Sequence, residues 1–215
     1  MIFFSHPTTI IVAGPTQCGK THFVVRTINE KLIRPEPERI IWLYSFWQPA
    51  YEELTNVEFI KSTPVDIADG VLARLLNDRL KPENRNLLVL DDLMSALCDS
   101  ADLSRLFTEG SHHLNLTVVY IVQNIFQRGK SQRTASLNTH YFIIFKNPRD
   151  SSQIHCLSRQ ICPGRSSSLV KIYDDITGAE PYSYLFIDCH PKTPNNLRFC
   201  TKIFHNEETF AYQPR

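Results

Sequence analysis

The chain has 215 residues, enough for one sizeable α/β domain, and a formal net charge of only +1 at pH 7. So small a charge excludes nucleic-acid binding through a surface that is basic as a whole, and confines any such binding to a local patch or pore. The six cysteines show no C-x-x-C spacing, which indicates reduced thiols in an intracellular protein, and no apolar run approaches the roughly 18 residues of a membrane span.

Apolar, β-branched runs alternate with helix-like segments along the chain. The runs that predict strands cover residues 8–13, 39–44, 57–60, 86–90, 116–122, 140–145, 184–188 and 197–204. The segments that predict helices cover residues 20–33, 66–80, 101–112, 149–161 and 168–176. This alternation is typical of an α/β fold with a mostly parallel sheet flanked by helices. We therefore expect a single domain over residues 1–215, with its core at 8–204, a short N-terminal edge strand or packing arm, and an exposed C-terminal tail from residue 207.

A glycine loop lies between the first predicted strand and the first predicted helix, and it matches the complete pattern G-x-x-x-x-G-K-[ST]. Its residues are Gly14, Pro15, Thr16, Gln17, Cys18, Gly19, Lys20 and Thr21. In this strand–loop–helix context the pattern predicts a phosphate loop (P-loop, or Walker A motif) whose backbone N–H groups and helix N-terminus bind an anion. Lys20 would contact the β- and γ-phosphates of ATP, and the Thr21 hydroxyl would bind Mg²⁺.

A second nucleotide motif ends the strand predicted at 86–90. Two carboxylates, Asp91 and Asp92, follow this apolar run, which is the form of a Walker B motif. We expect Asp91 to bind Mg²⁺ opposite Thr21, and Asp92 to act as general base on the attacking water. The alternative is a solvated Asp-Asp turn. The strand at 39–44 separates the two motifs in the sequence, which favours the additional-strand, catalytic-carboxylate branch of P-loop ATPases over a nucleotide kinase.

The strand predicted at 116–122 ends in a polar pair, Gln123 and Asn124. In a P-loop fold a side chain at this strand tip faces the γ-phosphate, so Gln123 could orient the attacking water. The alternative is an amide that only caps the following turn.

Three cations follow that strand: Arg128, Lys130 and Arg133. Either arginine could act as an arginine finger on the γ-phosphate of a neighbouring subunit, and the group could contact DNA phosphates. The alternative is a solvated basic loop.

Together these residues resemble a known family. The segments that carry the resemblance are Gly14 to Thr21, Leu87 to Asp92, Gly110 to His113, Gln123 to Phe126, Arg133 to Asn138 and Phe145 to Asp150. They look like the genome-packaging ATPases of DNA viruses in the FtsK–HerA superfamily, particularly the poxvirus-type enzymes and their relatives in Polinton/Maverick elements and adintoviruses. The resemblance covers about residues 8–204. One departure is Asp92, because the wider superfamily usually has Glu at this position.

The resemblance implies an ATP- and Mg²⁺-dependent hydrolase that works as a homo-oligomeric ring and threads double-stranded DNA, independently of its sequence, into a preformed capsid. The implied partner is a capsid portal or vertex rather than a membrane, and the implied location is the nucleus or viral factory of an infected cell, or the virion. Two alternatives stay open: a helicase-like ATPase, and a nucleotide-gated assembly switch in which turnover is incidental.

Overall fold

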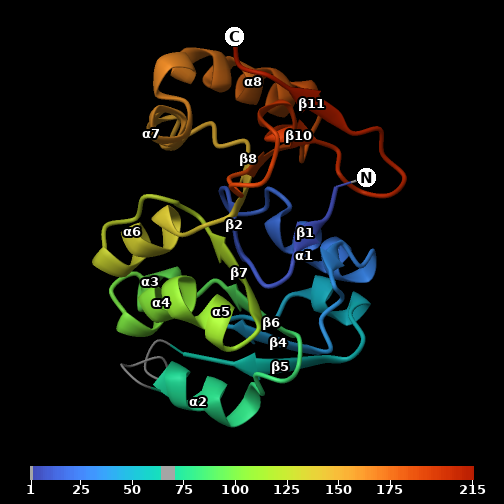
Figure 1. Ribbon diagram of the computed structural model, residues 1–215, viewed down its shortest axis with the longest axis vertical. Helices are drawn as coiled ribbons and strands as arrows, with labels where there is room; N and C mark the ends of the chain where they lie inside the picture. The colour runs from blue at the N-terminus through green and yellow to red at the C-terminus, as the bar shows by residue number, and fades with distance from the viewer. Residues whose placement is uncertain (1, 64–70) are drawn as a thin grey trace.

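The computed structural model describes residues 2–63 and 71–215, and its centre is a large twisted sheet (Figure 1). The strands of this sheet are β2 (Thr9–Ala13), β4 (Arg39–Tyr44), β5 (Val57–Lys61), β6 (Asn86–Asp91), β7 (Leu116–Val122), β8 (Tyr141–Phe145), β9 (Tyr184–Asp188), β10 (Phe199–Thr201) and β11 (Phe210–Tyr212). Their spatial order is β11-β10-β9-β8-β2-β7-β6-β4-β5. Pairing is parallel from β8 through β5 and antiparallel from β8 through β11. The predicted fold class, a P-loop type α/β fold with a mostly parallel sheet flanked by helices, is confirmed.

Helices lie on both faces of the sheet. They are α1 (Lys20–Asn29), η1 (Pro49–Glu53), α2 (Val71–Arg79), α3 (Met94–Leu97), α4 (Ala101–Arg105), η2 (Leu106–Gly110), α5 (Ser111–His113), α6 (Lys130–Leu137), α7 (Ser152–Ile161), η3 (Pro163–Arg165), α8 (Ser166–Ala179) and η4 (Asn195–Leu197). In Figure 1, α1 lies on one side of the sheet and α3 to α6 lie on the other.

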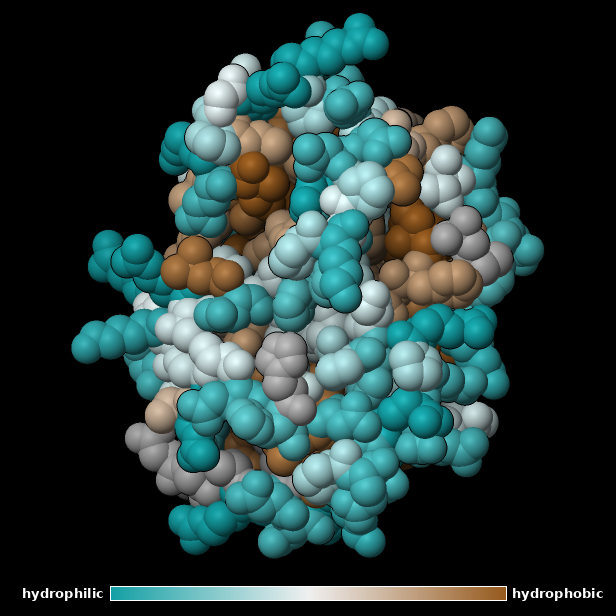
Figure 2. Space-filling view, viewed as in Figure 1, coloured by the Kyte–Doolittle hydropathy of each residue, from teal (hydrophilic) through white to brown (hydrophobic). Residues whose placement is uncertain are grey.

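The alternation of side chains along the strands divides the core into two apolar layers. Ile10 and Val12 of β2 pack with Phe23 of α1, whereas Ile11 and Ala13 belong to the layer under the helices of the opposite face. All four strand residues are at most 2% exposed, as expected for a central strand that is buried on both faces. Figure 2 shows the resulting surface, which is mostly hydrophilic on this face, with hydrophobic side chains gathered in recessed places.

The strand order corrects one step of the sequence reasoning. In the sheet, β7 separates the P-loop strand β2 from β6, whereas β4 lies on the far side of β6. The additional strand is therefore β7, and not the strand that separates the two motifs in the sequence. Because β2, β4, β6 and β7 are parallel, their carboxyl ends, and the polar residues that follow them, share one edge of the sheet.

Several predicted elements differ at their ends. The first helix stops at Asn29, and Lys31 has φ +55°, a left-handed conformation that ends a helix. The next residues form β3 (Ile33–Arg34), which pairs in parallel with β1 (Phe4–Ser5) in a separate two-stranded sheet, so the N-terminal arm is anchored. The helix predicted at 101–112 is interrupted by the π-helical turn η2.

The second predicted helix and the C-terminus also differ from expectation. Residues 66–70 of the helix predicted at 66–80 lie outside the described residues, and α2 covers the rest up to Arg79. The expected exposed tail contains β11, which extends the sheet by pairing with β10. No helix within the described ranges is both long and apolar enough to cross a lipid bilayer.

Candidate active site

The P-loop connects β2 to α1 through a tight backbone path. Gly19, immediately before the helix, has φ +99°, which favours glycine. A β-carbon at Gly14 would come within 2.6 Å of Cys18 Sγ and 2.8 Å of Phe145 Cβ, so a side chain has no room there. The helix starts without a side-chain cap, which leaves N–H groups of its first turn available to an anion.

The ammonium group of Lys20 lies against its own loop. Its Nζ donates hydrogen bonds to the carbonyl oxygens of Gly14, at 2.8 Å, and Pro15, at 2.7 Å. These neutral acceptors hold the cation above the loop, where a phosphate could replace them as the stronger, charged partner.

Asp91 is the most strongly perturbed carboxylate of this edge. It is 2% exposed, and its Oδ2 accepts hydrogen bonds from Thr21 Oγ1 at 3.2 Å, Tyr51 Oη at 2.9 Å and Gln48 Nε2 at 3.5 Å. Burial raises the pKa of Asp91 to about 6, against the opposing effect of the Tyr51 and Thr21 hydrogen bonds. The structure thus brings the two predicted metal ligands, Thr21 and Asp91, into direct contact.

Asp92 and Gln123 reach the same edge from neighbouring strands. Asp92 is exposed and has φ +57°, uncommon for a residue other than glycine, and its carbonyl oxygen accepts a hydrogen bond from Ser45 Oγ at 3.1 Å. Gln123 is exposed at the end of β7. Both residues line a cleft of about 1030 Å³ that Lys20, Thr21 and Asp91 also line. The predicted phosphate, metal and water-activating residues therefore share one site.

Two buried glutamines hold the loop that follows Gln123. Gln132 of α6 donates from Nε2 to the carbonyl oxygen of Ile125 at 3.0 Å, and Gln153 of α7 accepts from the Ile125 N–H at 3.0 Å. The Asn124 side chain caps the turn that follows it, because its Oδ1 accepts a hydrogen bond from the Phe126 N–H at 2.8 Å. The residues after the strand tip are thus tied to α6 and α7.

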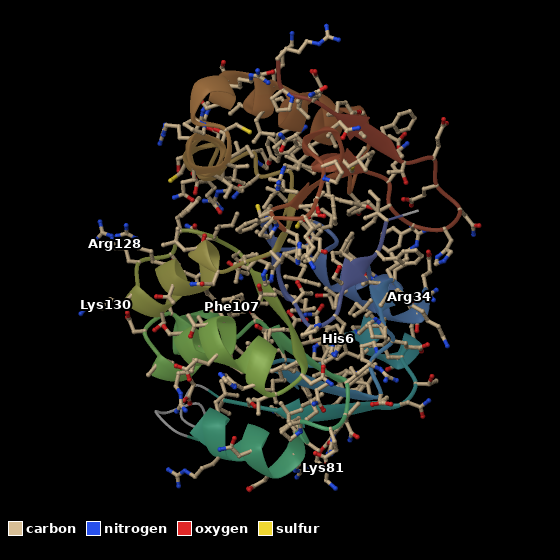
Figure 3. The ribbon with its side chains drawn as sticks, viewed as in Figure 1. His6, Arg34, Lys81, Phe107, Arg128 and Lys130 are labelled. Carbon is tan, nitrogen blue, oxygen red and sulfur yellow. The ribbon has the colours of Figure 1, made fainter. Side chains whose placement is uncertain are left out.

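The predicted cations lie elsewhere. Arg128 and Arg133 border a smaller hollow of about 340 Å³ that does not include the P-loop residues. Arg128, Lys130 and Arg133 are exposed, and none forms an ion pair with another residue in the described ranges. Figure 3 shows Arg128 and Lys130 projecting outward beside α6.

The backbone under these cations is fixed. A β-carbon at Gly129 would lie 2.3 Å from the Cys98 carbonyl oxygen, so only glycine allows this approach. Asp99 Oδ1 accepts a hydrogen bond from the Lys130 N–H at 3.2 Å. Residues 128–133, which we call the cation segment, are therefore held firmly against the connection between α3 and α4, while their charged side chains face solvent.

Sequence reasoning missed Tyr51 and Gln48, which both contact Asp91. They belong to the connection after β4, where no motif marks them. Tyr51 is 1% exposed and packs against Trp42 and Phe59, with ring centroids at 4.9 Å and 5.3 Å. Only the folded arrangement of β4 beside β6 shows that this aromatic cluster supports the Asp91 carboxylate.

The donor set suits Mg²⁺. A threonine hydroxyl and an aspartate carboxylate are hard oxygen ligands, and Mg²⁺ sites of this kind are completed by substrate phosphates and water. Among the side chains that the structure describes there is no group of three or more His, Cys, Asp or Glu that could by itself hold a metal ion.

No family model and no curated protein matches the sequence. Solved structures do match the fold. The genome-packaging NTPase B204 of Sulfolobus turreted icosahedral virus 2, in complex with ATP-gammaS, has a TM-score of 0.60 and 10% identity over 97% of this chain and 98% of its own. The DNA-packaging ATPase B204 of Sulfolobus turreted icosahedral virus has a TM-score of 0.60 and 10% sequence identity, and the match covers 98% of each chain. The cytoplasmic domain of the Thermomonospora curvata Type VII secretion ATPase EccC has a TM-score of 0.54 and 14% sequence identity. The match covers 96% of this chain and 25% of the EccC chain.

Proposed function

We propose that the protein is an ATP-hydrolysing motor that moves double-stranded viral DNA into a preformed capsid. The observation that carries the proposal is the convergence of Lys20, the Thr21–Asp91 pair, Asp92 and Gln123 in one cleft. The likeness to the fold of packaging ATPases over nearly the whole chain supports the choice among P-loop functions. ATP is the proposed substrate and Mg²⁺ the proposed cofactor.

The P-loop residues bind and orient the phosphates. Lys20 exchanges its two carbonyl partners for β- and γ-phosphate oxygens, and the first N–H groups of α1 face the same anion. These donors are fixed before the reaction, so they stabilise the charge that develops in the transition state without reorganising.

Thr21 and Asp91 hold the metal, with Tyr51 and Gln48 orienting the carboxylate. Bound Mg²⁺ would neutralise phosphate charge. Asp92 takes the proton of the attacking water, and Gln123 orients that water from the tip of β7. The aspartate side chain is one methylene shorter than the usual glutamate. The left-handed backbone of Asp92 changes the direction in which its side chain leaves the main chain.

The DNA contact belongs to the exposed cations. Arg128, Lys130 and Arg133 provide a local positive charge on a nearly neutral protein, which suits sequence-independent contacts to phosphates. Gln132 joins α6, which carries Lys130 and Arg133, to the loop after Gln123, and would couple a change at the cleft to the DNA contact.

One arginine of this segment would act as a finger in a neighbouring subunit of a homo-oligomeric ring, since Arg128 and Arg133 both lie outside their own chain's cleft. The same proposal includes a poxvirus-type or Polinton-like affiliation and a capsid portal or vertex as partner. It also includes a location in the nucleus or viral factory, or in the virion.

The test compares ATP hydrolysis with and without duplex DNA of unrelated sequences. We expect stimulation by every duplex, weakening steeply with salt. Lys130→Ala should reduce the stimulation several-fold without changing ATP affinity. The control is Lys81→Ala, an exposed lysine at the bottom of the view in Figure 3 and away from Lys130, which should leave the stimulation unchanged. A rate of ATP hydrolysis that duplex DNA does not change at low salt would favour the nucleotide-gated switch. Strand separation of a forked duplex would favour a helicase.

A further inference from the structure

The cleft extends well beyond the catalytic residues. From Asp91 and Gln123 it passes the P-loop and reaches the turn between α8 and β9, where residues 180–184 form its wall. Within this turn Tyr182 is 71% exposed. Its ring lies beside the P-loop, because a β-carbon placed on Gly19 would be 3.5 Å from Tyr182 Cδ1.

The backbone of Tyr182 is unusual for an aromatic residue. The turn closes with a hydrogen bond from the Ser183 N–H to the Glu180 carbonyl oxygen at 3.4 Å, and Pro181 occupies its second position. Tyr182 follows with φ +63°, a conformation that favours Gly or Asn in such turns and costs a bulky residue on the order of 1 kcal/mol. Since most of the ring is exposed, core packing does not account for an aromatic side chain here.

The sheet order gives the direction in which a nucleotide must extend. The P-loop follows β2; the metal-side and water-orienting residues follow β6 and β7, on one side of β2. A triphosphate whose reacting end faces Asp91 and Gln123 therefore directs its nucleoside to the other side, over β8 and β9. Tyr182 lies two residues before Tyr184, the first residue of β9, and so stands on that side.

We propose that the ring of Tyr182 is the platform on which the nucleobase stacks, an inference that rests on the proposed nucleotide-binding function of the cleft. Every base has a π-face, so the platform contributes affinity for nucleoside triphosphates with little choice among bases. The turn is held in place by the ion pair between Glu180 and Lys202, at 3.0 Å, and both residues line the same end of the cleft.

The test measures equilibrium binding of two probes, ATP and inorganic tripolyphosphate, to the full chain. Tyr182→Ala should weaken ATP binding about 10- to 100-fold, the usual range for losing one base–aromatic stack, and leave tripolyphosphate binding unchanged. Tyr182→Phe should keep ATP affinity within about twofold, because the ring remains. Tyr182→Gly, which suits the left-handed backbone, should repeat the Ala result and separates ring loss from strain in the turn.

Two controls complete the design. Phe210→Ala removes a 43% exposed aromatic ring outside the cleft and should change neither affinity. Lys20→Ala should weaken both probes, because it acts on the phosphates. The inference is overturned alone if the wild-type protein binds ATP but the Ala and Gly variants at Tyr182 match it, or if they weaken both probes equally. A wild-type protein that binds neither probe overturns the nucleotide-binding function as well.

Discussion

The carboxylate end of the cleft and the cation segment differ in how many partners their charged side chains have within the chain. At the first, Asp91 accepts three hydrogen bonds, and the Lys20 ammonium donates to two carbonyl oxygens and to the Cys18 sulfur of the P-loop. At the second, Arg128, Lys130 and Arg133 are exposed on a tightly held backbone. A site preorganised within one chain fits chemistry on a small substrate, whereas exposed, fixed cations fit a partner that arrives from outside.

The largest effect in this comparison should come from Lys20. Lys20→Ala removes the only lysine of the P-loop and should lower ATP hydrolysis at least about a hundredfold, or about 3 kcal/mol of transition-state stabilisation. Steady-state phosphate release measures the loss. An active Lys20→Ala protein would move the phosphate contact away from the cleft.

Asp92→Asn should be next in size. The amide cannot take a proton from water, so turnover should fall by about a hundredfold while ATP stays bound. Turnover and equilibrium ATP binding, measured on the same preparation, separate the two effects. Turnover equal to that of the wild type would assign the base to another residue.

The two regions should complement each other across a subunit boundary. If Arg128 or Arg133 completes a neighbour's site, an Arg→Ala variant mixed with Lys20→Ala should recover part of the hydrolysis, about a quarter of wild-type activity at most for random pairing in a dimer-like interface. Wild-type activity should also rise more than linearly with protein concentration. Absence of rescue for both arginines would leave the cation segment with the DNA contact alone.

The last prediction concerns stability in the absence of metal, and not activity. Asp91 has a folded pKa of about 6, above its ordinary value of 3.8, so the folded state binds the proton more tightly. Between about pH 4 and pH 6 the metal-free protein should therefore lose stability as pH rises, by up to about 3 kcal/mol, with little further change above pH 6. Asp91→Asn lacks this titration and should melt about 6 to 12 °C higher than the wild type at pH 7.5 in EDTA, if the full ~3 kcal/mol is lost, with little difference near pH 4. Melting curves at the two pH values measure it, and a lower melting temperature for Asp91→Asn at pH 7.5 would contradict the buried-charge account.

The parts of the site that the sequence predicted are those carried by local patterns. The P-loop and the Asp91–Asp92 pair each adjoin an apolar strand, so their place at the strand ends follows from the chain itself. Tyr51 and Tyr182 could not be found this way, because their roles depend on which strands become neighbours: β4 beside β6, and β9 beyond β8. The same reason explains why β7 rather than β4 is the additional strand. The edge strand β11 was missed because only its partner β10 turns this short, exposed segment into a strand.

Movement of the protein along duplex DNA is the central claim, and displacement of a fluorescent triplex-forming oligonucleotide from a linear duplex measures it directly. We predict that assembled wild-type protein releases the oligonucleotide in the presence of Mg²⁺ and ATP, with a lag that grows with its distance from the duplex end. Lys20→Ala should release none, and Lys130→Ala should release it more slowly than Lys81→Ala. Hydrolysis of ATP on duplex DNA with no release of the oligonucleotide at any distance would contradict a translocating motor.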